Sequence, residues 1–320
     1  MKKHKYLWAC IYGAVLFAFT VYALLDTFVI VRVYEVPEQP VKTVITQETD
    51  GTEVDLPDTE TEQLTSDTAD TVYIEPVFTE NSYVDSNMKI EITEYRYNNT
   101  NVYVADIVLS SPEYLKTALA KSTYGKNVTD KTSVIADGVG AILAINGDYY
   151  GARESGYVIR NGILYRDRAS KNGVDLVVYE DGGMQIINES DITAQELIIN
   201  GAYNVLSFGP GLISDGQITV SENYEVGVAM ASNPRTAVGM IDDLHYVFVV
   251  SDGRTTDNEG LSLYELAEFM KNELNAVTAY NLDGGGSSTM VFNGTVINNP
   301  TTNGRKIKER SVSDIVYIGY

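Results

Sequence analysis

The N-terminal part of the chain is one long apolar stretch behind a short basic tip. Residues 1–5 contain three lysines and a histidine, and no charged residue occurs from Tyr6 to Leu25. About 20 apolar residues suffice to cross the hydrocarbon core of a bilayer as a helix. We therefore predict a transmembrane anchor over residues 6–33, with residues 1–5 cytoplasmic because basic residues favour that side.

A cleaved signal peptide is the alternative interpretation of this stretch. Val21-Tyr22-Ala23 has the small-residue pattern of a cleavage site, which would yield a secreted protein. The apolar stretch resumes after Asp26 and runs to Val31, which favours a retained, single-pass anchor. Under both interpretations the rest of the chain lies outside the cytoplasm.

Residues 34–87 differ sharply in composition from the anchor. They are rich in Thr, Glu, Asp and Pro, and Lys42 is their only basic residue. Such a segment buries too little apolar surface to offset the loss of chain entropy on folding. We predict a disordered acidic linker that extends through its own charge repulsion.

Residues 88–320 have the alternating polar and apolar positions, separated by turn residues, that are typical of a folded domain. Polar and apolar residues alternate over 89–97 and 102–109 around Asn98-Asn99, which predicts a hairpin. Residues 141–145 are uniformly apolar, as in a buried strand, and Ser111-Pro112-Glu113 predicts a short helix. Further strands are predicted at 157–160, 176–179, 184–187, 205–208, 237–241, 245–250, 279–282, 289–292 and 314–318.

The long helical pattern covers residues 262–274. Ser262 and Glu265 have the spacing of a capping box at its start. Many strands with few helices predict an α+β domain built on a largely antiparallel or mixed β-sheet.

Composition restricts the chemistry available to this domain. The formal net charge of −21 argues against nucleic-acid binding, which needs a basic face. The single cysteine, Cys10, lies in the apolar stretch, and the two histidines are His4 and His245. Disulfides within the chain and a multi-histidine zinc site are therefore excluded, and a Ser-His-Asp triad would need His245. Hydrolysis would have to depend on carboxylates, amides, hydroxyls and arginines.

The most specific motif is Asn281-Leu282-Asp283-Gly284-Gly285-Gly286-Ser287-Ser288, directly after a predicted strand. Glycines allow close approach of a ligand to the backbone, and successive N–H groups in such a turn can bind an anion. Ser287 and Ser288 add hydroxyl donors, and Asp283 lies at the strand end, where a carboxylate can face a cleft. A tight turn between strands is the structural alternative.

Three other motifs follow or precede predicted strands. Asn146-Gly147-Asp148 follows a buried strand, although Asn-Gly is also a common hairpin turn. Arg235 precedes a strand and could hold a phosphate through two parallel hydrogen bonds, although surface arginines after turns are common. Asp252 and Arg254 flank Gly253 at another strand end, where Asp-Gly is ordinary turn chemistry.

In this order, and together with Phe208-Gly209-Pro210-Gly211, Gly260-Leu261-Ser262-Leu263 and Glu309-Arg310, the motifs closely resemble the phosphodiester glycosidase domain family. That family includes an enzyme that removes N-acetylglucosamine from mannose 6-phosphate diesters and many bacterial proteins labelled exopolysaccharide biosynthesis proteins. The resemblance covers roughly residues 88–320. The chain lacks cysteine-rich extensions and has a basic anchor, so it looks like a bacterial envelope member.

The resemblance implies a glycoside hydrolase acting on a sugar-1-phosphodiester of a cell-envelope or exopolysaccharide glycan. Asp283 and Asp148 are the expected catalytic pair. Residues expected to bind the sugar or phosphate are Asn146, Arg235, Asp252, Arg254, Gly284, Gly285, Gly286, Ser287, Ser288 and Arg310. No cofactor is certain. A divalent metal is possible because several carboxylates are expected to converge, although no ligand set has diagnostic spacing.

Two alternatives remain at this point. The domain could be a non-catalytic module that binds a wall polymer or sugar phosphate, or a metal-dependent phosphodiesterase that cleaves the other P–O bond. All three interpretations expect the regions around residues 148, 235, 252 and 283 to meet in one polar pocket walled by aromatic residues.

Overall fold

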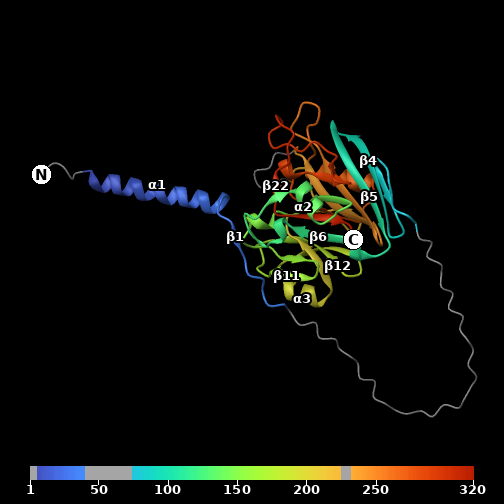
Figure 1. Ribbon diagram of the computed structural model, residues 1–320, viewed down its shortest axis with the longest axis horizontal. Coiled ribbons are helices and arrows are strands. Elements are labelled where there is room, and N and C mark those ends of the chain that lie inside the picture. The colour runs from blue at the N-terminus through green and yellow to red at the C-terminus, as the bar shows by residue number, and fades with distance from the viewer. Residues whose placement is uncertain (1–5, 40–73, 225–231) are drawn as a thin grey trace, which may run out of the picture.

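The computed structural model describes residues 6–39, 74–224 and 232–320. Most of the predicted acidic linker lies outside these ranges, so its disorder stays a prediction. Helix α1 (Leu7–Phe28) projects away from the folded domain, as Figure 1 shows, and buries none of its residues. By length and composition it is the only helix among the described residues that could span a membrane. Such a helix near the N-terminus fits a signal anchor or a signal peptide.

The largest element is a nine-stranded sheet in which every neighbouring pair is antiparallel. Both of its faces are covered. In the central strand β18 (His245–Ser251), Phe248 and Val250 lie in one hydrophobic core and Val247 and Val249 lie in another. Both faces of the strand are therefore buried, which explains why residues 246–250 are all apolar. The strands in spatial order are β16 (Gln217–Ile218), β15 (Gly211–Ser214), β19 (Thr278–Asn281), β17 (Arg235–Asp242), β18 (His245–Ser251), β5 (Thr100–Leu109), β4 (Met88–Tyr97), β3 (Ser82–Val84) and β2 (Val77–Phe78).

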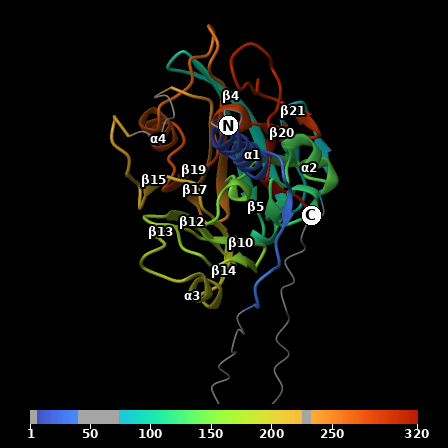
Figure 2. The ribbon, with the colours of Figure 1, turned by 90° about the vertical axis from the view of Figure 1, so that its left-hand side faces the viewer.

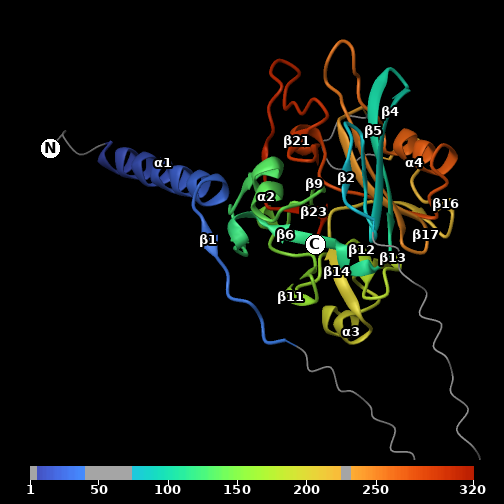
Figure 3. The ribbon, with the colours of Figure 1, turned by 45° about the vertical axis from the view of Figure 1, so that its right-hand side comes forward.

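Two five-stranded antiparallel sheets pack against one face of the large sheet through a shared core. Figure 3 shows β9 and β23 on one side of the domain and β4 and β5 on the other. The first small sheet is β21 (Thr295–Val296), β20 (Met290–Phe292), β9 (Leu143–Asn146), β23 (Asp314–Ile318) and β6 (Leu115–Leu119). The second is β11 (Ile163–Arg166), β10 (Val158–Arg160), β14 (Ala202–Leu206), β12 (Val174–Tyr179) and β13 (Met184–Asn188).

Three short helices cover the outer faces of these sheets (Figure 2). Helix α4 (Leu263–Asn272) packs on the nine-stranded sheet through Leu266, Phe269 and Met270 and begins with the predicted capping box. Helix α2 (Thr132–Gly138) covers the first small sheet, and α3 (Ala194–Ile199) covers the second. The predicted α+β class is therefore confirmed, with every strand pair antiparallel among the described residues.

The remaining elements are short. Two-stranded pairs join β1 (Arg32–Val33) to β7 (Gly125–Lys126) and β22 (Ser311–Val312) to β8 (Asp130–Lys131). The helix expected after Ser111 is a single 3₁₀ turn, η1 (Pro112–Tyr114). The other 3₁₀ turns are η2 (Ala120–Ser122), η3 (Tyr150–Ala152) and η4 (Gly285–Ser287).

The folded domain includes residues that precede Met88. Strand β3 pairs with β4, and Tyr83 within it is buried. The carboxylate of Asp85 accepts hydrogen bonds from the Tyr83 hydroxyl at 2.5 Å and from the Met88 N–H at 2.8 Å. The sheet thus begins at Val77, inside the segment expected to be linker, because its two short edge strands carry little pattern of their own.

Antiparallel pairing brings the sequence-distant motifs to one end of the nine-stranded sheet. Arg235 at the start of β17 pairs with Ser251 at the end of β18, and the end of β19 lies on the other side of β17. The end of β9 arrives from the small sheet, where the Gly147 carbonyl accepts the Asp283 N–H at 3.3 Å. Strand order therefore assembles the site from four separate loops.

Candidate active site

A cavity of about 190 Å³ whose lining includes several charged residues opens at this end of the sheet. Three guanidinium groups and one carboxylate reach it, together with one aromatic ring. The lining residues are Phe208, Asn233, Arg235, Arg254, Asp283, Gly284, Gly285 and Arg310. Asp283 therefore shares this cavity with five other residues that the sequence predicted at the site: Arg235, Arg254, Gly284, Gly285 and Arg310.

Asp283 supplies the carboxylate of the cavity. It directly follows β19 through Leu282, and the residue is 8 % exposed. Its Oδ2 accepts a hydrogen bond from Nη2 of Arg310 at 2.6 Å. Its backbone is fixed on both sides, since its N–H donates to Gly147 and its carbonyl accepts from Asn146. The chain thus holds one partly accessible carboxylate in a defined position.

Arg310 connects the carboxylate to the glycine-rich turn. Its Nε donates to Oγ of Ser287 at 2.8 Å, and its backbone N–H donates to the Gly286 carbonyl at 3.1 Å. The guanidinium carbon lies 6.0 Å from the ring centroid of Tyr149. Ser287 therefore positions an arginine instead of facing the cavity directly.

Arg235 and Arg254 form the opposite part of the lining. Arg235 is buried and its Nε donates to the Leu261 carbonyl at 2.8 Å. Arg254 donates from Nε and Nη2 to the Asn233 side-chain oxygen at 3.1 and 2.8 Å, and from Nη1 to the Thr302 carbonyl at 2.6 Å. These bonds fix the direction of each planar guanidinium before a ligand arrives.

The electrostatics of the cavity favour an anion. Burial, together with the charge of Arg254, lowers the pKa of Arg235 to about 10. Burial and the charge of Arg310 lower the pKa of Arg254. Three cations held against one carboxylate thus repel one another, and a bound phosphate would relieve that repulsion.

The glycine-rich turn contributes less backbone to the cavity than the sequence suggested. The N–H of Gly285 donates to the Pro234 carbonyl at 2.8 Å, while those of Ser287 and Ser288 donate to Gly284 and Gly285 at 3.3 and 3.2 Å. The expected anion nest is therefore not formed by these three N–H groups. Ser288 is fully buried and does not line the cavity. Gly286 lies against Thr302, whose Oγ1 would be 2.4 Å from an added Cβ.

Asn146 lies beneath the site, holds its backbone through hydrogen bonds, and does not line the cavity. It is fully buried, and its Nδ2 donates to the Asp283 carbonyl at 2.7 Å. Its Oδ1 accepts from the Thr236 hydroxyl at 2.8 Å and from the Thr289 N–H at 3.2 Å. The predicted contact with a sugar hydroxyl is corrected accordingly: this amide joins β17 to the loops that follow β19 and precede β20, behind Asp283.

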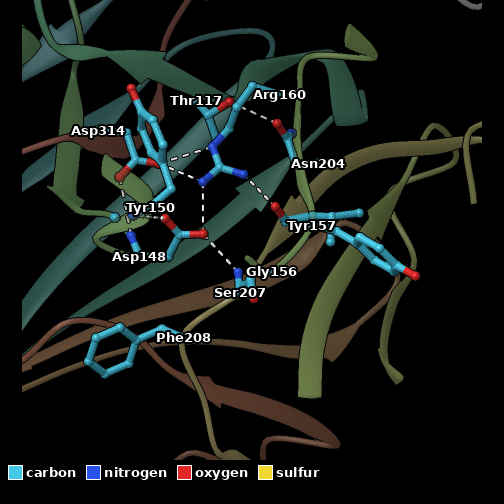
Figure 4. Close-up of polar contacts among 12 residues, drawn as sticks. Thr117, Asp148, Tyr150, Gly156, Tyr157, Arg160, Asn204, Ser207, Phe208 and Asp314 are labelled. Atoms are coloured by element: carbon cyan, nitrogen blue, oxygen red, sulfur yellow. Dashed lines mark hydrogen bonds and ion pairs between the residues drawn. The ribbon is translucent and has the colours of Figure 1, made fainter. Parts of the chain in front are cut away.

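Asp148 also differs from expectation, because its carboxylate is fully buried away from the cavity lining. Figure 4 shows it beside Arg160, whose Nη2 lies 2.8 Å from its Oδ2. The same Oδ2 accepts the Ser207 N–H at 2.7 Å, and Oδ1 accepts the Tyr150 N–H at 3.0 Å. We therefore assign Asp148 to the support of the neighbouring loops and not to the reacting pair.

Asp314 shares Arg160 with Asp148. Its Oδ2 accepts from Nε and Nη2 of Arg160 at 2.9 and 2.8 Å. Burial and the charge of Asp148 raise the pKa of Asp314 to about 7. Burial acts to raise the pKa of Asp148 too, but Arg160 and the Ser207 N–H outweigh it and lower that pKa. Arg160 thus keeps the pKa of Asp148 low, whereas the raised pKa of Asp314 makes that carboxylate easier to protonate.

The expected role of Asp252 is corrected as well. It is 2 % exposed and absent from the cavity lining. Its carboxylate accepts the N–H and side-chain amide of Asn299 at 2.8 and 2.9 Å, and it lies 3.4 Å from the amide of Asn298. Asp252 therefore holds the loop after β21 in place and does not contact the proposed phosphate site.

Two lining residues, Asn233 and Phe208, were not expected at the site, although Phe208 begins a motif of the resemblance and Asn233 lies two residues before Arg235. Asn233 precedes Pro234 and orients Arg254. Phe208 lies under the guanidinium carbon of Arg153 at 4.8 Å from its ring centroid. An aromatic residue just before Gly-Pro-Gly was the available signal. Among the described residues, no group of three or more His, Cys, Asp or Glu side chains is placed to hold a metal ion.

Comparison with known proteins identifies the family. The phosphodiester glycosidase family profile matches residues 139–319, more than half of the chain. The uncharacterized SPbeta prophage-derived protein YomE of Bacillus subtilis (strain 168) is 31 % identical over 187 residues, covering 56 % of this chain and 28 % of that protein. The human and mouse N-acetylglucosamine-1-phosphodiester alpha-N-acetylglucosaminidases are 29 % and 28 % identical, covering 50 % and 51 % of this chain and 33 % and 34 % of theirs. The chain spans about a third of the length of these curated relatives.

A solved structure shares the fold. The catalytic domain of the zebrafish enzyme of the same name, auto-inhibited by its pro-peptide, superposes with a TM-score of 0.57 at 23 % identity, covering 73 % of this chain and 83 % of that one. The chain belongs to the phosphodiester glycosidase family, as its ordered motifs predicted.

Proposed function

We propose that this protein hydrolyses a sugar-1-phosphodiester by cleaving the bond between the anomeric carbon and the phosphate oxygen. The observation that carries the proposal is the cavity in which the carboxylate of Asp283 faces three guanidinium groups. Family membership supports it, because several relatives are named as glucosaminidases of such diesters. The proposed substrate is a glycan of the cell envelope or an exopolysaccharide.

The residues of the cavity fit the two ends of the scissile bond. Arg235, Arg254 and Arg310 would hold the phosphate and stabilise the charge that it gains on leaving. Asp283 would stabilise the positive charge that develops at the anomeric carbon. The bonding electron pair leaves with the phosphate oxygen, a water oxygen bonds to the anomeric carbon, and one proton is released.

The N-terminal helix suggests where this reaction takes place. A retained α1 would anchor the enzyme in the cell membrane with its N-terminus in the cytoplasm and the domain outside. Cleavage after Ala23 would instead release the domain as a secreted enzyme. Mass spectrometry of the N-terminus of the mature protein distinguishes these two forms.

Turnover of a panel of sugar-1-phosphodiesters, with and without a chelator, tests the proposed function. We expect release of free sugar and a phosphate monoester, with N-acetylglucosamine diesters as the first substrates because of the names of the relatives. Binding without product would support a non-catalytic module. Activity lost with chelator and restored by a divalent ion would support a metal-dependent phosphodiesterase.

Gly285→Ala should weaken substrate binding specifically. An added Cβ would lie 2.9 Å from Nη2 of Arg254 and displace that guanidinium from the phosphate. Because hydrogen bonds to charged groups contribute about 1.5–3 kcal/mol, we expect KM to rise about tenfold or more. Gly140→Ala is the matched control, since both glycines have φ of +63° but no atom lies within 4 Å of the Cβ added at Gly140. Equal KM values in the two variants would contradict the assignment of Arg254.

A further inference from the structure

The segment that follows helix α1 is attached to the catalytic domain and does not run free into the linker. Strand β1 pairs with β7 through Arg32–Lys126 and Val33–Gly125. The Tyr34 ring lies 5.5 Å from that of Tyr124, centroid to centroid, and joins a small aromatic cluster. We call residues 29–39 the docked segment.

Its far end is attached as well. The side chain of Gln39 bonds both backbone groups of Leu164, accepting the N–H at 2.8 Å and donating to the carbonyl at 3.0 Å. The docked segment is therefore attached to the domain at two places, at β7 and at β11; it is the blue chain that runs on from β1 in Figure 1.

Polar contacts also tie the end of helix α1 to the same surface. Nδ2 of Asn127 donates to the carbonyl of Ile30 at 2.9 Å and to that of Asp26 at 3.4 Å. The carboxylate of Asp26 pairs with Lys126 at 3.4 Å and with Arg32. The last turn of the helix is thus held at a fixed place on the domain.

That place adjoins the active site. A second cavity, of about 350 Å³, is walled on one side by Thr27 and Phe28 of α1 and on the other by Tyr149 and Arg310. Arg310 lines both cavities and pairs with Asp283. The two cavities therefore adjoin at Arg310, and the second one reaches the end of the helix.

The length of α1 places this end at the edge of a bilayer. Its 22 residues span roughly 33 Å at 1.5 Å per residue, about the thickness of the hydrocarbon core. If α1 crosses the membrane, Phe28 lies at the outer interface, and so does the second cavity. Lys126, Arg153 and Arg310 give that cavity three cationic side chains, against the single carboxylate of Glu154.

From this geometry we propose that the substrate is a sugar-1-phosphodiester whose phosphate is esterified to a membrane lipid. The inference rests on the proposed function. The sugar occupies the first cavity, the phosphate lies among the arginines, and the lipid chain extends through the second cavity into the adjacent bilayer. Cleavage at the anomeric carbon releases the free sugar, and the lipid leaves as its phosphate monoester. The docked segment holds the site at that depth. Without docking, residues 29–76 would allow the domain to move on the order of 150 Å from the membrane.

Gly125→Ala in the full-length protein tests the inference. The added Cβ would lie 2.2 Å from the Arg32 carbonyl oxygen and so would force β1 away from β7. The protein is reconstituted in phosphatidylcholine vesicles and given two N-acetylglucosamine 1-phosphate esters, a water-soluble methyl ester and a hexadecyl ester embedded in the same vesicles. Gly138→Ala is the control, because its Cβ meets no atom within 4 Å.

We expect the wild type and Gly138→Ala to prefer the hexadecyl ester, and Gly125→Ala to lose about tenfold in kcat/KM on it, while the methyl ester is cleaved as before. Equal kcat/KM values of the wild type on the two esters would overturn the inference and leave the proposed function intact. So would a Gly125→Ala variant that retains the preference, or one that loses both activities equally. If the wild type cleaves neither ester nor any member of the panel of sugar-1-phosphodiesters, the proposed function itself fails.

Discussion

Asp283→Asn should lower kcat on a sugar-1-phosphodiester by on the order of 10³-fold, with KM changed only a few-fold. The amide retains the size of the side chain but loses the charge that opposes the developing positive charge at the anomeric carbon. Ground-state binding should persist because the three arginines that face the phosphate remain. Steady-state kinetics on purified protein measures both constants.

Asp215→Asn is the matched control for this substitution. Asp215 is exposed in the turn between β15 and β16, and asparagine accepts its left-handed φ of +49°. We expect this variant to have wild-type kcat and KM. Full turnover by Asp283→Asn would contradict the role assigned to that carboxylate, and equal losses in the two variants would show that the effect is unspecific.

Arg160→Met should produce the largest loss of stability, about 3–5 kcal/mol in the free energy of unfolding. Arg160 is 2 % exposed and lies between two fully buried carboxylates, those of Asp148 and Asp314. Methionine fills much of the volume but leaves both acids without their ion-pair partner, and at least one of them would have to take up a proton. Urea unfolding followed by circular dichroism measures the difference.

Arg168→Met provides the comparison for a surface arginine. Its side chain is exposed in the loop after β11, so we expect a change of less than about 0.5 kcal/mol. If Arg160→Met unfolds at the same urea concentration as wild type and Arg168→Met, the buried ion triad does not stabilise the fold as inferred here.

The sequence predicted the long elements of the fold better than the short ones. Alternation over β4 and β5 and the capping box of α4 are local signals, and both elements form as expected. Strand β3 and helix α3 are short and gain their stability from the surfaces they cover. Helix α3 does carry a capping box between Thr193 and Glu196, which is the one local signal that predicts its start.

At the candidate site, the sequence identified the correct loops but not the direction of every side chain. Asp283 and Asp148 both follow a buried strand within an Asp-containing turn, so local pattern does not distinguish them. Tertiary contacts do: Asp148 is enclosed by Arg160, whereas Asp283 meets an arginine at the cavity wall. Asp252 bonds two asparagines nearly 50 positions away along the chain. No local motif predicts such a contact.

Hydrolysis in water labelled with heavy oxygen tests the central claim most directly. Mass spectrometry of the two products shows which bond has been broken. Attack at the anomeric carbon, beside Asp283, predicts that the label enters the released sugar and that the phosphate monoester carries none. Label in the phosphate, with an unlabelled sugar, would show that the P–O bond breaks and would contradict the account.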